Sequence, residues 1–176
     1  MGSASSASRE QIIAALAATR TAPEPIAGFT GDPVRFGDLE AAFRDALGAA
    51  GGSLVAFPDR GALDRALAAA EPGAVVLAGG PAVAESGAVW WVPRDEAERR
   101  AAFLAERVIL VVAREQLVGD LHAAYQQIDP AAAHYGCFVA GPSKTADIEQ
   151  ALVIGAQGPR ALAVYLWGAE PAPRNQ

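Results

Sequence analysis

The run "RVILVVA", residues 107–113, is the most strand-like stretch of this chain. It is apolar along its whole interior, with no alternation of apolar and polar positions. A strand that is apolar on both sides has to be covered on both faces, as the strands of parallel sheets are. The run therefore predicts a strand inside a buried sheet.

Shorter apolar runs lie on either side of this strand. Amphipathic segments of about 10–15 residues separate them, and residues 114–128 are predicted to form one such helix. Alternation of this kind predicts an α/β fold, with a mostly parallel sheet and helices on both faces. Besides 107–112, the strands expected in that sheet are residues 53–56, 74–78, 136–140 and 161–166.

Length and charge narrow the class of protein. A chain of 176 residues fits one domain; we expect a disordered N-terminus over 1–8, a domain over 9–167 and a disordered tail over 168–176. The net charge of −6 argues against general nucleic-acid binding, which needs clustered Lys and Arg. No apolar stretch approaches the ~18–20 residues of a membrane span, and the N-terminus has no signal-peptide pattern. A soluble, cytoplasmic protein is expected.

Metal-ligating residues are scarce. Cys137 is the only cysteine, and His122 and His134 are the two histidines. One thiol cannot hold an iron–sulfur cluster or a cysteine-rich zinc site. We therefore expect no metal and no cofactor in this chain.

The stretch "GPSKTADIE", residues 141–149, follows a predicted strand. In open α/β sheets, ligands bind at loops of this kind, where backbone N–H groups are exposed. Gly141 would allow a sharp turn, while Ser143 and Thr145 can cap a helix or hold an anion. The alternative is a capped strand-to-helix turn that binds nothing. Neither the Walker motif nor G-x-G-x-x-G is present.

Three charged residues follow within the same stretch. Because Thr145 is a capping residue, the pattern favours a turn or helix start, in which Asp147 and Glu149 face different ways. Asp147 is then expected to bind backbone N–H groups and Glu149 to face a pocket, as a candidate catalytic group. In an extended chain the two would share a face. Lys144, the only lysine, is a further candidate for ligand binding.

A second candidate is Glu85, in the stretch "AVAESGAV". A carboxylate among small apolar residues would be partly desolvated, which suits acid–base or nucleophilic catalysis. The alternative is an exposed turn residue or a carboxylate bound to backbone N–H groups. Ser86 and Gly87 adjoin it as candidate ligand-binding residues. We expect this turn and residues 143–149 to line one pocket on the same side of the sheet.

The run from Gly141 to Glu149, with "QALVIG", "AQGP" and "RALAVYLW" after it, closely resembles the motif of the lactate-utilization protein C family, the LUD domain. That motif is Gly-Pro-Ser-x-Thr-Ala-Asp-Ile-Glu. "AVAESGA" is similar to the family's Ala-x-Ala-Glu-Thr-Gly-Thr segment, in which Ser86 keeps one hydroxyl and Ala88 loses the other.

The resemblance implies a fold similar to the sugar-phosphate isomerase and CoA-transferase group. It also implies an accessory or co-catalytic subunit of a system that oxidises L-lactate to pyruvate. The iron–sulfur clusters of that system belong to partner proteins. The alternative is a stand-alone CoA-transferase-like or sugar-phosphate-binding enzyme, in which Glu85 is the nucleophile and residues 143–149 hold a small carboxylate or phosphate.

Overall fold

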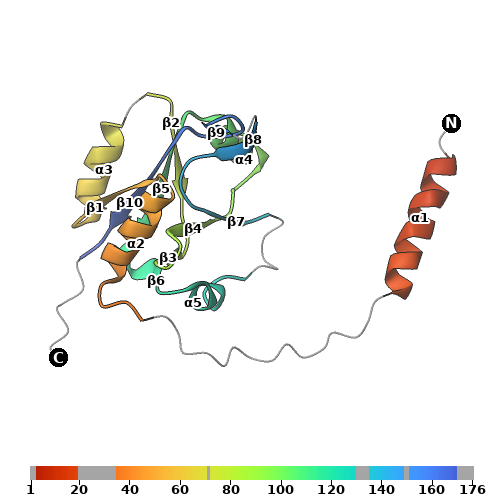
Figure 1. The fold of residues 1–176 in the computed structure, drawn as a ribbon, viewed down its shortest axis with the longest axis horizontal. Coiled ribbons are helices and arrows are strands. Elements are labelled where there is room, and N and C mark those ends of the chain that lie inside the picture. The colour runs from red at the N-terminus through yellow and green to blue at the C-terminus, as the bar shows by residue number, and fades with distance from the viewer. Residues whose placement is uncertain (1–2, 20–34, 71, 130–134, 149–150, 170–176) are drawn as a thin grey trace. The chain divides into compact units, whose positions relative to one another are not determined.

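The computed structural model describes residues 3–19, 35–70, 72–129, 135–148 and 151–169 (Figure 1). The chain forms two compact units, Met1–Asp32 and Pro33–Gln176. In the first unit, helix α1 spans Ser3–Ala18, so it begins ahead of residue 9, where we expected order to start. The side chains of residues 8–19 are exposed.

The second unit holds the remaining helices and strands. Its helices are short, and most strands have five residues or fewer. In chain order they are α2 (Leu39–Ala49), β1 (Ser53–Phe57), α3 (Arg60–Ala68), β2 (Ala74–Ala78), β3 (Ala82–Val83), β4 (Ala88–Trp91), α4 (Glu96–Leu104), β5 (Arg107–Ala113), a 3₁₀ turn (Arg114–Gln116), β6 (Leu117–Val118), α5 (Leu121–Tyr125), β7 (Cys137–Val139), β8 (Lys144–Ile148), β9 (Ala151–Ile154) and β10 (Ala161–Trp167).

Each of the helices α2 to α5 starts at an aspartate. The carboxylate accepts the N–H three residues further on, which the helix itself leaves without a partner. Such a cap contributes about 1 kcal/mol to helix stability. The caps are Asp38, Asp59, Asp95 and Asp120.

The "RVILVVA" run forms β5, an inner strand of a four-stranded sheet ordered β1-β10-β5-β2. All neighbouring strands in this sheet are parallel, as the sequence predicted. Leu110 and Val112 of β5 are fully buried, as are Val164 and Leu166 of β10. These side chains occupy the centre of the main hydrophobic core.

Helices cover both faces of this sheet. Phe43 and Leu47 of α2 and Ala102 of α4 join the core on the face that carries Leu110. On the other face, which carries Trp167, α3 packs with Arg60 5.7 Å from the centre of that indole ring. The expected arrangement of helices on both faces is confirmed, and Figure 1 shows the layers.

The expected strand over 136–140 does not belong to the parallel sheet. Residues 137–139 form β7, which pairs antiparallel with β4 in a second sheet ordered β6-β3-β4-β7. Trp90 and Phe138 meet across this ladder, with ring centres 5.0 Å apart. An apolar run indicates burial but not its neighbour, so the sequence pattern could not separate the two sheets.

The single helix expected over 114–128 is also wrong. This segment forms a 3₁₀ turn, the short strand β6 and then α5. Asp120 starts a new helix by accepting the N–H of Ala123 at 2.7 Å. The cap in the middle of the segment makes one continuous helix impossible.

Residues 144–148 form a strand, where a turn or helix start was favoured. β8 pairs antiparallel with β9, and this hairpin is a separate two-stranded sheet. Thr145 stands opposite Val153 in the ladder, so its position is extended rather than a helix cap. Backbone pairing with the following segment outweighs the local capping preference of a single residue.

Replacing Phe43 tests the contact between α2 and the sheet. Phe43 is 0% exposed, so we expect Phe43→Ala to lower the free energy of unfolding by about 3–5 kcal/mol through lost burial and a residual cavity. The control is Phe103→Ala, because Phe103 is 48% exposed and should contribute far less. Denaturant unfolding measures both. Equal losses would mean that α2 is not anchored as described.

Candidate functional site

The two motif segments lie opposite each other at the end of the β4–β7 ladder. Val89 pairs with Val139, and the two strands run antiparallel. The turn that precedes β4 and the chain that follows β7 therefore leave this ladder at the same end. The prediction that the two segments line one pocket stays a prediction.

Both glycines contact the last turn of α2. A Cβ on Gly87 would lie 2.3 Å from the backbone nitrogen of Leu47, and a Cβ on Gly141 would lie 2.1 Å from the carbonyl oxygen of Ala50. Both residues also have positive φ, +66° and +69°, which side chains disfavour. Glycine is required at both positions because the helix backbone occupies the space of a side chain.

Lys144 lies over the C-terminal end of the same helix. Its Nζ is 3.2 Å from the place that a Cβ on Gly51 would take. The carbonyl groups at a helix C-terminus carry partial negative charge, so a cation there is stabilising. This gives Lys144 a structural role independent of any ligand.

Glu85 is exposed, and its carboxylate is bound to backbone. Its Oε1 accepts the N–H of Leu121 at 2.9 Å, at the start of α5, and its own N–H donates to the carbonyl of Gly119 at 3.0 Å. The expectation of a partly desolvated carboxylate is corrected, because the side chain lies at the surface. The alternative that the sequence left open, a carboxylate bound to backbone N–H groups, describes its position.

The Ser143 backbone joins the two ends of the 141–160 segment. Its N–H donates to the carbonyl of Pro159 and its carbonyl accepts the N–H of Gly155, both at 2.9 Å. Ser143 itself is half-buried. The two Gly-Pro ends of the segment are therefore held together by main-chain hydrogen bonds.

The Ser86 hydroxyl has an environment that the sequence alone did not indicate. Its Oγ is buried and has no hydrogen-bond partner within the described part of the chain. A buried hydroxyl without a partner costs about 1–3 kcal/mol. Neighbouring Gly87 is buried against α2, whereas Glu85 is exposed.

The acid pair of the motif is only partly described. The backbone of Asp147 lies in β8, but the structure does not describe its side chain, and Glu149 lies outside the described residues. Up to Ile148 the chain follows the extended alternative. The roles assigned to both acids remain predictions.

An ion-pair network at the carboxyl edge of the parallel sheet was missed by sequence reasoning. Arg114, which is 10% exposed, forms an ion pair with Glu40 and donates to the carbonyl of Gly168 at 3.1 Å. Glu40 also bonds Arg44 at 2.8 Å. The four-residue spacing of Glu40 and Arg44 is a signal for the second pair. The edge where ligands of open sheets usually bind is tied here by internal ion pairs.

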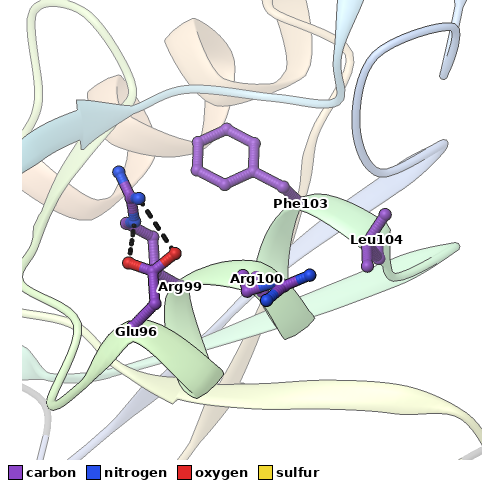
Figure 2. A pocket seen from close by; sticks show the side chains of 5 residues that line it. All are labelled: Glu96, Arg99, Arg100, Phe103 and Leu104. Atoms are coloured by element: carbon purple, nitrogen blue, oxygen red, sulfur yellow. Dashed lines mark hydrogen bonds and ion pairs between the residues drawn. The ribbon is translucent and has the colours of Figure 1, made fainter. Parts of the chain in front are cut away.

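A shallow cavity of about 370 Å³ lies along α4 (Figure 2). Arg99 forms two hydrogen bonds with Glu96, at 2.8 and 3.0 Å, and this pairing lowers the pKa of the Glu96 carboxyl. None of the motif residues lines this cavity; its walls are Glu96, Arg99, Arg100, Phe103 and Leu104.

Behind Arg99 lies a small cluster that includes the single cysteine. The Arg99 guanidinium lies 5.3 Å from the centre of the Tyr135 ring, and the Tyr135 hydroxyl donates to Cys137 Sγ at 3.5 Å. That hydrogen bond, with partial burial, raises the pKa of Tyr135 above its ordinary value. The Cys137 thiol, on β7 of the second sheet, thus lies beside the Tyr135 hydroxyl.

Within the described ranges, no three His, Cys, Asp or Glu side chains gather as metal ligands would; His134 lies outside these ranges. None of the described helices combines the length and apolarity that a membrane crossing needs.

Comparison with known proteins shows the fold and the family of this chain. A solved structure titled as a DUF162 family protein, from Deinococcus radiodurans, matches with a TM-score of 0.51 and 17% identity, covering 77% of this chain and 100% of that one. At this identity the likeness shows the fold, a layered α/β domain. The model of the LUD domain family matches residues 49–167. The chain belongs to the LUD domain family.

Two curated relatives match part of this chain. Both are named lactate utilization protein C, one from Geobacillus thermodenitrificans with 37% identity and one from Geobacillus kaustophilus with 36%, each over 83 residues. The aligned stretch covers 44% of this chain and 35% of each relative. The match thus spans about a third of the relatives' length.

The glycine contacts with α2 predict opposite effects at two positions. Gly141→Ala should destabilise the protein by more than about 1 kcal/mol, because φ is positive and the helix backbone fills the site. Gly48→Ala, inside α2 with open space around it, should stabilise by about 0.5–1 kcal/mol. Thermal and denaturant unfolding of the two variants measure this. A tolerated Gly141→Ala would contradict the close approach.

Proposed function

We propose that this chain is an accessory subunit of a system that oxidises L-lactate to pyruvate. The observation that carries the proposal is the family match over residues 49–167, together with relatives named for lactate utilization. Oxidising lactate removes two electrons and two protons. In the proposed division of labour, iron–sulfur clusters on partner proteins take up the electrons.

The positions of the motif residues support an accessory role over a catalytic one. Gly87 and Gly141 hold α2, Lys144 lies at the end of that helix, and Glu85 binds the start of α5. One cysteine in this chain cannot supply the thiolates of a cluster. We propose that the cluster-bearing subunits carry the redox chemistry and that this chain provides a folded surface for them.

The alternative function is a stand-alone enzyme, and the experiments below distinguish it from an accessory subunit. A CoA-transferase-like mechanism needs the Glu85 carboxylate to attack a substrate carbonyl while its Oε1 accepts the Leu121 N–H. A small carboxylate or phosphate ligand at residues 143–149 would raise the melting temperature through mass action. Lactate, pyruvate, CoA esters and sugar phosphates are suitable probes for that measurement.

Growth on L-lactate tests the proposal. Deleting the gene from its host should abolish growth on L-lactate and spare growth on other carbon sources, and the wild-type chain should restore it. Glu85→Gln should restore growth equally well, as should the matched control Glu115→Gln at another exposed glutamate. Affinity capture of the restored chain should bring down a protein that contains iron and acid-labile sulfide.

Two results would contradict this reading. Normal growth of the deletion strain on L-lactate would remove the role in lactate use. Loss of growth with Glu85→Gln alone, while that variant remains folded, would favour the enzyme in which Glu85 is the nucleophile.

A further inference from the structure

The cavity of about 370 Å³ along α4 is lined by one face of that helix (Figure 2). Its lining residues are separated by three or four positions, a spacing that makes side chains neighbours on a helix; they are Glu96, Arg99, Arg100, Phe103 and Leu104. Pockets of about 300–1,000 Å³ hold small organic ligands. The cavity therefore has room for a ligand of this class, at a place away from both sequence motifs.

The lining carries one positive charge that the fold leaves without a partner. Arg99 donates to both carboxylate oxygens of Glu96, so these two charges cancel, and Figure 2 shows the pair joined by dashed lines with Arg100 beside it. Arg100 makes no hydrogen bond or ion pair within the described residues. After Arg99, its charge also lowers the pKa of the Glu96 carboxyl. A singly charged anion complements this cavity, because a dianion would also meet the Glu96 carboxylate.

Phe103 and Leu104 provide the apolar part of the cavity. They are 48% and 81% exposed, so a ligand that covered them would remove apolar surface from water. They follow Arg100 by three and four positions, which is about 4.5–6 Å along the helix axis. An anion that reaches all three side chains needs an apolar group at that distance from its charge. Lactate, with a single methyl group, is too short.

We propose that this face of α4 binds an organic monocarboxylate with an apolar group about one helical turn, roughly 5.4 Å, from its carboxylate. Arg100 holds the carboxylate through two N–H donors. The apolar group lies over Phe103 and Leu104. Such a site is independent of any role in lactate use.

The affinity should be low, because the site is open and makes few contacts. A ligand of about a dozen heavy atoms should bind with a dissociation constant on the order of 1 mM. Phenylbutyrate is a suitable probe, since its short methylene chain separates a carboxylate from a phenyl ring. Two matched compounds are phenylbutanamide, which has nearly the same shape without the charge, and butyrate, which has the charge without the ring.

NMR titration of the isotope-labelled full chain tests the proposal. Phenylbutyrate should shift the amide signals of α4 and saturate, whereas phenylbutanamide and butyrate should each bind about tenfold more weakly or not at all. Equal affinity for phenylbutyrate and phenylbutanamide would overturn the proposal, and so would shifts that do not saturate or that lie outside α4.

Variants assign the binding to single side chains. Arg100→Gln and Phe103→Ala should each weaken phenylbutyrate binding by about tenfold. Arg65→Gln, at an exposed arginine on α3, is the matched control and should bind as the wild type does. The residues replaced are exposed, so the amide spectra of the variants should remain those of a folded chain.

Two further outcomes would contradict a ligand site on α4. Unchanged affinity in Arg100→Gln would mean that its guanidinium does not hold the carboxylate. Amide signals of α4 that shift with protein concentration in the absence of ligand would mean that a second copy of the chain covers this face.

Discussion

The last turn of α2 rests directly on two glycines that have no room for a side chain. Gly87 enters the second sheet through β4, and Gly141 leaves it after β7 and leads to the hairpin. The helix itself runs on through Gly51 and Gly52 into β1, at the edge of the parallel sheet. These two backbone-to-backbone contacts therefore connect the parallel sheet, the second sheet and the hairpin, and a side chain at either glycine would push the helix away.

The charged residues of the two motifs complement helix ends. Glu85 binds the N–H at the start of α5, where the helix dipole favours an anion, and Lys144 lies at the C-terminus of α2, where it favours a cation. In these positions both charges stabilise helix ends of the same chain. A glutamate or lysine in a loop of an α/β protein is readily interpreted as catalytic. Here the contacts of Glu85 and Lys144 with nearby backbone explain why both residues are present.

The carboxyl edge of the parallel sheet is closed in a similar way. Arg114 links the ends of β5 and β10 to α2 by its ion pair with Glu40 and its hydrogen bond to the carbonyl of Gly168. Arg44, which also pairs with Glu40, donates to the carbonyl of Leu54 in β1. With that edge tied and the motifs holding α2, the exposed apolar side chains, such as Leu104 of α4 and Leu121 of α5, are available for contact with other proteins. That distribution suits a subunit whose contribution is to bind.

The sequence by itself determined the parallel sheet, because strands such as "RVILVVA" are apolar on both sides and must be buried on both faces. It also indicated the turn at Glu85. Tertiary structure alone decided that residues 137–139 join a second sheet, that 144–148 are a strand, and that Gly87 and Gly141 both contact the end of α2. Local composition records whether a segment is buried, whereas its pairing partner is set by hydrogen bonds to residues far away in the chain.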